Sequence, residues 1–310
     1  MPGIGGDTLN WRLRRPKGHP ESMSELYLTE LVRKALAEDI GTGDVTTELI
    51  VSPTRRSTAQ ILARERLVLA GTEAARLVFT QLDRDIGFEL NKIDGSTIAP
   101  DEEIAVVSGR AAAILSAERV AVSYLQRMSG IATLTRRFVE KVEGLPVLIA
   151  DTRKTTPGLR VMEKKAVRTG GGVNHRVGLY DGILIKENHL AALGGNEVIK
   201  RAVERARKEA HHLIKVGIEV SSAEDAEIAA RAGADVIMLD NMGVRDMKDT
   251  VRRIREIGDR VTIEASGSVC LDNVREIAET GVDIISVGKL THSAPAVDIS
   301  LEIVENASSA

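Results

Sequence analysis

Charged residues follow an apolar run in the segment IADTRKTTPGLR, residues 149–160. Asp151, Arg153 and Lys154 come directly after LPVLIA, and a Thr-Thr-Pro-Gly turn comes next. A short apolar run is typical of a buried strand, and two cations at its end can bind an anion through charge-assisted hydrogen bonds. The segment therefore predicts a site for an anionic ligand at the end of a strand.

Polar residues follow five other apolar runs in the same way. Lys186 ends GILIK, Glu219 lies near the end of IKVGIEV, and Asp240 ends DVIMLD. The runs VTIEAS and DIISVG end in Ser266 and Gly288, where glycine-bearing loops begin. In a β/α barrel the carboxyl ends of the strands share one rim, which carries the chemistry. We therefore expect these residues to surround a single site.

Three loops carry glycines beside groups that suit anions. SGSV, with Gly267, and VGKLTHSA follow the last two apolar runs, where barrel enzymes favour phosphate. GGGVNHRVGLYD, residues 170–181, combines three consecutive glycines with His175 and Arg176, which favours a hinge or a ligand clamp. The guanidinium of Arg176 suits bidentate binding of carboxylate or phosphate. His175 is either a ligand group or a hydrogen-bonded core histidine.

Structural interpretations stay open for several of these positions. A charge beyond a strand can begin a solvated loop or cap a helix, as Ser222 could. Glu219 and Asp240 either bind Mg²⁺ and stabilise a developing cation, or form a structural salt bridge with Lys186 or Lys215. Cys270, which follows a strand, is either a nucleophile or a structural residue.

Beyond Gly144 the sequence alternates between apolar runs and amphipathic segments. Six runs are identified as strands, at residues 147–151, 182–186, 214–220, 235–240, 261–266 and 283–288. Segments between them, such as RDMKDTVRRIREIG, have apolar residues at helical spacing. Unbroken apolar strands alternating with helices predict a parallel sheet covered by helices, and we expect a β/α barrel. Six units are clear where a complete barrel has eight, so either irregular strands are hidden or the barrel is incomplete. A doubly wound open sheet is the alternative, although no GxGxxG follows any strand.

The sequence before Gly144 has a different pattern. Residues 1–23 combine glycines, prolines and RLRRPK without periodicity, and we expect a flexible tail. From residue 24 a helical stretch, two strand-like runs and a long helical stretch predict an α+β domain.

The composition narrows the class of protein. Lys and Arg number 42 and Asp and Glu 45, so the formal net charge is −3 and gives no overall basic field for nucleic acid. Aromatic residues make up 2%, so a planar ligand would be held by charge rather than by stacking. The single Cys270 excludes an internal disulfide, and no apolar run reaches the roughly 20 residues of a membrane span. We expect a cytoplasmic protein with neither nucleic-acid nor membrane partners.

Several motifs in order resemble one enzyme family. EDIGTGDVTT, DTRKTTPGLR, GGGVNHRVGLYDGILIKENH, IEV, IMLDN, EASG and ISVGKLTHSAPAVDISL are similar to the nicotinate-nucleotide pyrophosphorylase (carboxylating) family, also called quinolinate phosphoribosyltransferase. The resemblance spans residues 24–305. It implies an N-terminal α+β sandwich-like domain at residues 24–130, joined by residues 291–310, and an incomplete catalytic barrel of about seven strands at residues 131–290.

The resemblance also implies a reaction. Quinolinate and 5-phosphoribosyl-1-pyrophosphate (PRPP), with Mg²⁺, give nicotinate mononucleotide, CO₂ and pyrophosphate on the de novo route to NAD. The implied quinolinate ligands are Arg153, His175, Arg176 and Lys186, with Arg119 contributed by the neighbouring subunit of at least a homodimer. The implied PRPP and phosphate ligands are Lys154, Ser266, Gly267, Gly288 and His292. Glu219 and Asp240 match the carboxylates around the metal, directly or through water, and the ribose, and with Lys154 and Lys186 they make up the implied catalytic group.

The sequence departs from the family pattern at two places, and three other functions compete with this assignment. Ser221 and Ser222 stand where relatives often have another acidic residue, and Ser268 stands where a second glycine is common. The rivals are a barrel lyase with Lys186 as a Schiff base, a repurposed paralogue of the type associated with molybdenum transport, and a transferase that uses nicotinate. A Schiff-base lysine must lose its charge, whereas Glu219 and Asp240 nearby would retain it. Four cations suit a dicarboxylate better than a monocarboxylate.

Overall fold

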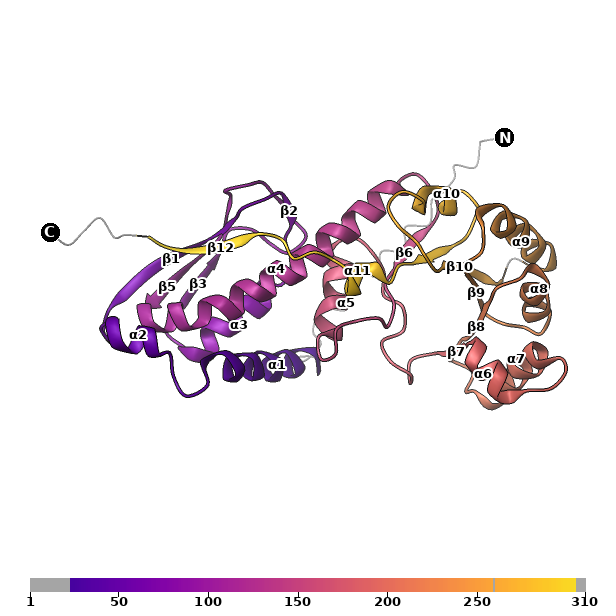
Figure 1. Ribbon diagram of the computed structural model, residues 1–310, viewed down its shortest axis with the longest axis horizontal. Helices are drawn as coiled ribbons and strands as arrows, with labels where there is room; N and C mark the ends of the chain where they lie inside the picture. Colours follow the sequence, from indigo (N-terminus) through magenta and orange to yellow (C-terminus); the bar gives the residue numbers. More distant parts are fainter. Residues whose placement is uncertain (1–22, 259, 305–310) are drawn as a thin grey trace, which may run out of the picture.

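The chain forms two parts that lie end to end, an α+β part and a barrel part (Figure 1). The computed structural model describes residues 23–258 and 260–304. The predicted tail lies outside these residues except for Met23, where the first helix begins. Among the helices described, none is long and apolar enough to cross a membrane.

The α+β part is built on a four-stranded antiparallel sheet in the order β12-β1-β5-β3. Alternate residues of β1 are buried, which is the pattern of a sheet that packs one face on a core. The long helix α4 contacts β1, β5 and β12, and α3 packs on α4. The elements are α1 (Met23–Ile40), α2 (Val45–Ile50), β1 (Arg56–Ala63), β2 (Leu67–Val68), α3 (Thr72–Leu82), β3 (Gly87–Leu90), β4 (Thr97–Ile98), β5 (Glu103–Arg110), α4 (Ala111–Lys141) and β12 (Ile299–Val304).

Two elements connect this part to the barrel. Strand β12, the last element described, pairs with β1 in the register Ala63 with Ile299 and Thr58 with Val304. Helix α4 runs for 31 residues and contacts α5, α11 and β6 of the barrel as well as the N-terminal sheet (Figure 1). The expected division after residue 130 therefore falls inside a continuous helix. At that position Gly130 packs directly against the backbone of Pro295.

The barrel part contains six parallel strands in the order β6-β11-β10-β9-β8-β7. Strand β6, the first of the six along the chain, pairs with β11, the last, which is the singly wound order of a barrel, so the doubly wound alternative is wrong. The strands are β6 (Leu148–Ala150), β7 (Ile183–Ile185), β8 (Val216–Val220), β9 (Val236–Asp240), β10 (Thr262–Ser266) and β11 (Ile284–Ser286).

The barrel is incomplete, as predicted, and its opening lies between β6 and β7. It has six described strands, where the family resemblance implied about seven. Val173 forms an isolated parallel bridge with Ala150: its N–H donates to the Ile149 carbonyl, and its carbonyl accepts from the Asp151 N–H. This single rung takes the place of a seventh strand within the described residues. The chain on either side of Val173 turns away into the polar loops of the site.

Helices cover the outside of the barrel (Figure 1). Their buried faces carry small and branched residues, as in α8 and α9, whereas their outer faces carry arginines and carboxylates. They are α5 (Arg160–Thr169), α6 (Glu187–Leu193), α7 (Val198–Glu209), α8 (Ala223–Arg231), α9 (Val244–Ile257), α10 (Val274–Ala278) and α11 (Lys289–His292).

Candidate active site

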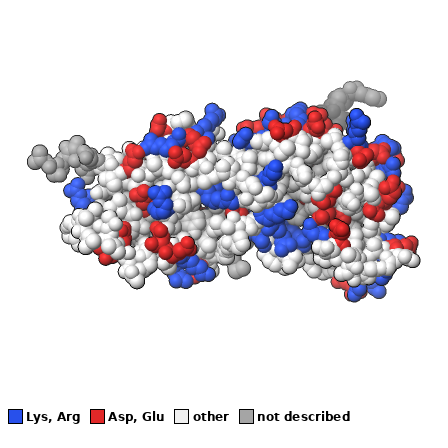
Figure 2. All heavy atoms as spheres, viewed as in Figure 1, with Lys and Arg blue, Asp and Glu red and all other residues white. Residues whose placement is uncertain are grey.

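An open cavity of about 1220 Å³, including its solvent-exposed mouth, lies at the carboxyl ends of the barrel strands. Most of the predicted site residues line it. The lining consists of Thr152, Arg153, Lys154, His175, Arg176, Leu184, Lys186, Glu219, Met238, Asp240, Asn241, Ser266, Gly267, Ser268 and Ser286. Figure 2 shows Lys and Arg side chains gathered near the middle of one face, with Asp and Glu beside them. The charge needed for an anion is thus supplied locally by a chain whose net charge is −3.

Two arginines of the cavity have unsatisfied donors. The Nε atoms of Arg153 and Arg176 are buried and have no hydrogen-bond partner among the residues described. Arg176 is anchored by a 2.9 Å bond from Nη1 to the Gly182 carbonyl. Burial, followed by the charge of Arg153, lowers the pKa of Arg176 from its ordinary value. Buried donors without partners are rare in proteins, so this pair is prepared to receive acceptor atoms from a ligand.

Lys186 and Glu219 form an ion pair at the mouth of the cavity. Lys186 directly follows β7, Glu219 lies in β8, and the two strands are paired. Glu219 therefore forms the salt bridge with Lys186 that was one of its two predicted roles. Both side chains also line the cavity. The Lys186 amine is thus occupied by Glu219, which leaves it poorly placed to act as a Schiff-base nucleophile.

The turn after β10 is held in a left-handed conformation by hydrogen bonds. Gly267 has φ 89°, and a Cβ at this position would overlap the side chain of Asn241. Ser268 has φ 47°, and its hydroxyl donates to Asn241 Oδ1 at 3.2 Å. Asn241 itself donates to Asp240 Oδ2 at 2.9 Å. Ser268, which stands where a second glycine is common in relatives, thus adds a hydrogen bond between this turn and the residue after β9.

Gly288 and His292 lie beside Lys154, although they do not line the cavity themselves. A Cβ at Gly288 would lie 3.1 Å from both His292 Nε2 and Lys154 Cδ, so glycine allows the three to pack closely. The hydroxyl of Thr291 donates to the Lys154 carbonyl at 2.8 Å. Lys154 is therefore held by α11, whose residues were expected to bind phosphate.

His175 is neutral in this environment. Burial, with the charges of Lys164, Arg176 and Lys186, lowers its pKa to about 4. Its Nδ1 accepts from the Arg176 N–H at 2.8 Å, which leaves the proton on Nε2, 3.6 Å from Glu264 Oε2. Glu264 is buried in β10, its Oε1 has no partner in the described structure, and burial raises its pKa to about 7.

Three residues singled out in the sequence lie elsewhere. Arg119 is on α4, with 67% of its side chain exposed, and does not reach this cavity. Ser222 caps α8 by accepting the Asp225 N–H at 3.1 Å, so it is a structural residue. Cys270 is half-buried before α10 and does not line the cavity.

Several charged groups lie behind the residues that line the cavity. Glu163 and Lys164 in α5, Glu264 in β10 and Asp151 at the end of β6 are buried, and Arg127 in α4 is partly buried. The sequence placed Asp151 at a strand end but gave no place in the site to Glu163, Lys164 or Arg127. Asp151 and Glu264 follow or interrupt apolar runs, which gives a weak signal in sequence. The two α5 residues stand in a polar helical stretch that resembles a solvated surface, so sequence offered no signal for their burial.

No cluster of three or more metal-ligating side chains occurs in the part of the chain that the structure describes. Glu219 and Asp240 both line the cavity. Mg²⁺ is commonly held by one or two carboxylates together with water and substrate phosphates. The donor set therefore fits Mg²⁺ that arrives with a phosphorylated substrate.

An incomplete barrel whose cavity gathers cations, adjacent carboxylates and a glycine-bearing turn at the strand ends has the architecture of a barrel enzyme that binds anions. Family models extend this class to a particular family. Residues 44–129 match the quinolinate phosphoribosyl transferase N-terminal domain, and residues 131–302 match its C-terminal domain. The chain belongs to the quinolinate phosphoribosyltransferase family.

Individual relatives agree over nearly the whole chain. A probable nicotinate-nucleotide pyrophosphorylase [carboxylating] of Bacillus subtilis is 43% identical to this chain, and the alignment covers 91% of this chain and 95% of the relative. Quinolinate phosphoribosyltransferase [decarboxylating] 1 of Nicotiana glauca is 38% identical, covering 93% and 85%. The solved nicotinate-nucleotide pyrophosphorylase from Francisella tularensis superposes with a TM-score of 0.84 at 39% identity, covering 90% and 96%.

Proposed function

We propose that this chain transfers the phosphoribosyl group of PRPP to the ring nitrogen of quinolinate and releases CO₂ and pyrophosphate, forming nicotinate mononucleotide for NAD synthesis. The observation that carries the proposal is the single cavity that gathers Arg153, Lys154, Arg176 and Lys186 beside Glu219 and Asp240. Family membership supports the same reaction.

Quinolinate occupies the side of the cavity formed by β6, the loop 170–181 and β7. Its two carboxylates satisfy the buried Nε donors of Arg153 and Arg176, and Lys186 supplies a third cation. His175, neutral and with its proton on Nε2, contributes a hydrogen bond rather than a charge. Nicotinate has one carboxylate and would leave part of this cationic set unpaired, and unpaired buried donors are unfavourable.

PRPP occupies the side formed by Lys154, the turn 266–268 and α11. The N–H groups of the glycine-bearing turn and the loop at Gly288 bind the 5-phosphate, and Lys154 binds both substrates. Glu219 and Asp240 would hold Mg²⁺ directly or through water, and the ion would supply positive charge to offset that of the pyrophosphate leaving group. The same carboxylates face the positive charge that develops on the ribose as the C1–pyrophosphate bond breaks.

Bond formation and decarboxylation follow from charge. The pyridine nitrogen donates its lone pair to ribose C1, and the ring becomes cationic. When the adjacent C–CO₂ bond breaks, its electron pair stays on the ring carbon, stabilised by the neighbouring cationic nitrogen, until that carbon takes a proton. The protein holds the retained carboxylate more tightly than the departing one, because a strong ion pair to the latter would oppose its departure.

The active enzyme is proposed to be at least a homodimer in which Arg119 reaches the cavity of the partner subunit. Arg119 is exposed on α4, one turn from Ser116, whose hydroxyl donates to Asp44 at the start of α2. Helix α2 exposes Val45, Leu49 and Ile50 nearby, and the loop at the barrel mouth exposes Leu179 and Tyr180. Exposed apolar groups of this kind mark protein interfaces. A cytoplasmic location is proposed from the single cysteine.

The decisive experiment incubates the protein with Mg²⁺, PRPP and either quinolinate or nicotinate, and follows CO₂ and mononucleotide. We expect stoichiometric CO₂ and nicotinate mononucleotide with quinolinate, and no turnover with nicotinate. Equal mononucleotide formation from both acids would contradict the proposed dicarboxylate site. Reduction by borohydride in the presence of a carbonyl substrate should leave Lys186 unmodified; trapping of Lys186 would favour the Schiff-base lyase.

A further inference from the structure

Three consecutive charged residues in α5 point in three different directions. Glu163 is fully buried, Lys164 is 3% exposed, and the side chain of Lys165 is half exposed. Successive helical residues are rotated by about 100°, so neighbours in sequence contact different surroundings. Removing a charge from water is unfavourable unless it is paired and hydrogen-bonded, and buried pairs often add little stability over apolar residues. The two buried charges therefore call for a function besides folding.

Lys164 holds the loop that carries His175 and Arg176. Its Nζ forms a buried ion pair with Asp151 Oδ1 and donates to the His175 carbonyl at 2.9 Å. Asp151 Oδ1 accepts the His175 N–H, also at 2.9 Å. Both backbone polar groups of His175 are thus bound to one buried ion pair. Asn174 completes the cluster by donating to Asp151 Oδ2 at 2.5 Å and to the Lys164 carbonyl at 2.8 Å.

Glu163 holds the opposite side of the cavity. It accepts from Arg127 Nη2 at 2.8 Å, from the Thr156 hydroxyl at 2.8 Å and from the Thr156 N–H at 3.0 Å. Arg127 continues the network by donating to the carbonyls of Ala294 and Thr291. The Thr291 hydroxyl donates to the Lys154 carbonyl. Glu163 thus links the Lys154 loop to α11, which carries His292.

We propose that Lys164 and Glu163 are positioning residues that divide the active site between them: Lys164, with Asp151, orders the quinolinate side, and Glu163, with Arg127, orders the phosphoribosyl side. The proposal rests on the substrate assignment given above. Neither residue lines the cavity, so each acts only through the backbone it holds. An error of about 1 Å in such groups can reduce catalysis about a hundredfold. Disturbing one network should therefore impair one substrate and spare the other.

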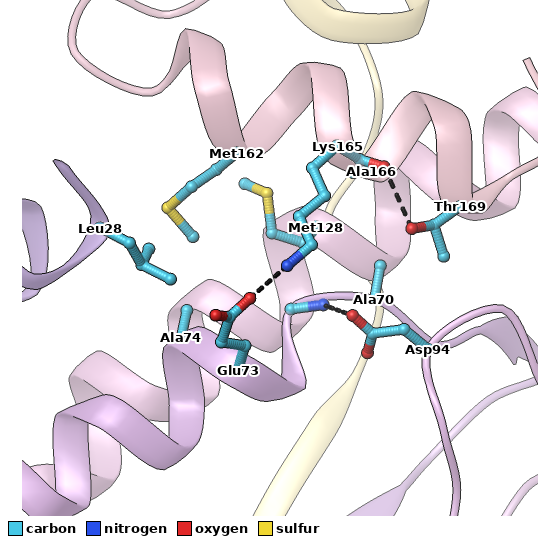
Figure 3. A pocket seen from close by; sticks show the side chains of 11 residues that line it. Leu28, Ala70, Glu73, Ala74, Asp94, Met128, Met162, Lys165, Ala166 and Thr169 are labelled. Atoms are coloured by element: carbon cyan, nitrogen blue, oxygen red, sulfur yellow. Dashed lines mark hydrogen bonds and ion pairs between the residues drawn. The ribbon is translucent and has the colours of Figure 1, made fainter. Parts of the chain in front are cut away.

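Lys165 provides a matched control. It is the same residue type one position along α5, but it pairs with Glu73 of α3 beside a separate cavity between the two parts of the chain (Figure 3). That cavity is lined by Leu28, Met128 and Met162 among others and contains none of the proposed substrate ligands. Lys165→Met removes an ammonium group from α5 without touching either buried network.

The test measures the KM for each substrate at saturation of the other. Two variants neutralise whole pairs and leave no unpaired buried charge: Asp151→Asn with Lys164→Met, and Arg127→Met with Glu163→Gln. We expect the first to raise the KM for quinolinate about tenfold and the KM for PRPP less than about twofold. The second should do the reverse. Lys165→Met should change neither constant.

Two milder variants keep the test decisive if a paired variant does not fold. Asn174→Ala and Thr156→Val leave both ion pairs in place, and each removes one hydrogen-bonded member of its network. We expect smaller shifts in the same directions, about threefold in the KM for quinolinate and for PRPP respectively.

The outcomes separate the inference from the substrate assignment. Equal changes in both constants, or lower melting temperatures with unchanged constants in all four variants, would overturn the division of labour. Arg176→Ala serves as a check on the assignment, because it removes a proposed quinolinate ligand directly. If that variant keeps the wild-type KM for quinolinate, the site assignment is wrong and the inference is lost with it.

Discussion

Glu264 and His175 are neighbours whose pKa values are shifted so that both are largely neutral between about pH 4 and 7. The two shifts act on stability in opposite ways. Between pH 4.5 and 7 the folded protein keeps the Glu264 proton that the unfolded chain loses, so stability falls as the pH rises. Between pH 6.5 and 4 the unfolded chain protonates His175 and the folded protein does not, so stability falls as the pH falls.

Glu264→Gln should isolate the first of these effects. The amide keeps the shape of the protonated acid and does not ionise, so the unfavourable burial of a carboxylate disappears. We expect the variant to gain on the order of 3 kcal/mol relative to wild type between pH 5 and pH 8. Urea unfolding of both proteins at the two pH values measures this difference. A difference in unfolding free energy that does not vary with pH would show that Glu264 is not the titrating group.

Arg176→Lys tests whether geometry or charge binds quinolinate. Lysine keeps the charge but loses the planar fork and the anchoring bond to the Gly182 carbonyl. We expect the KM for quinolinate to rise about tenfold or more, with the KM for PRPP nearly unchanged. Steady-state kinetics with each substrate varied in turn provide the measurement. A wild-type KM for quinolinate would mean that positive charge alone is sufficient.

Sequence predicted the residues that face the cavity better than those that support it. Arg153, Lys186 and Asp240 are recognisable because a charge directly after an apolar strand is conspicuous. Lys164 is not, since its partner Asp151 is 13 residues away and the pairing depends on how α5 packs under the loop. Burial of a charge is a property of the folded surroundings, and the local pattern does not record it.

At the scale of elements, α4 is one of the two connections between the parts, and Gly130 lies where this helix packs against the backbone of residues 295–296. A Cβ at Gly130 would overlap the carbonyl oxygen of Pro295, a rigid backbone atom. Gly130→Ala should therefore lower the free energy of unfolding by about 1 to 3 kcal/mol. Gly258→Ala is the control, because a Cβ there meets nothing within 4 Å. Equal melting curves for the two variants would show that the segment 293–298 shifts without penalty.

The elements themselves were largely predictable. All six predicted barrel strands overlap observed strands, because unbroken apolar runs such as DVIMLD have few other uses. The seventh position was not predictable in detail. Val173 follows three glycines whose N–H groups donate to carbonyls at the end of α5, and the His175 N–H beyond it donates to the Asp151 side chain, so that Val173 makes only one rung with β6.

At the scale of the whole molecule, the proposed dimer makes a prediction about mixed subunits. Arg119→Ala and Lys186→Ala would each inactivate the homodimer, since the proposed site takes Lys186 from one subunit and Arg119 from the other. Heterodimers formed by co-refolding equal amounts would contain one intact site, giving roughly a quarter of wild-type activity. Activity no higher than that of the separate variants would mean that Arg119 serves its own subunit or none.

The pairing of β12 with β1 was the feature of the fold that the sequence indicated least. DISLEIV is an ordinary strand pattern, and nothing local indicates β1, some 240 residues earlier, as its partner. Only the family resemblance implied that this segment returns to the first domain. Loss of β12 should therefore be severe: a chain that ends before Ile299 should aggregate on expression, which the soluble fraction, compared with that of the full chain, measures.

The late position of β12 also shapes how the protein is made. While the chain is being synthesised, β1 and β5 emerge early and can pair, but the other edge of β1 stays without its neighbour until the final strand has left the ribosome. An open strand edge is a template for pairing with other nascent chains. The sheet that begins to form first is thus completed only after the barrel strands have been made, and its unpaired edge is exposed over that interval.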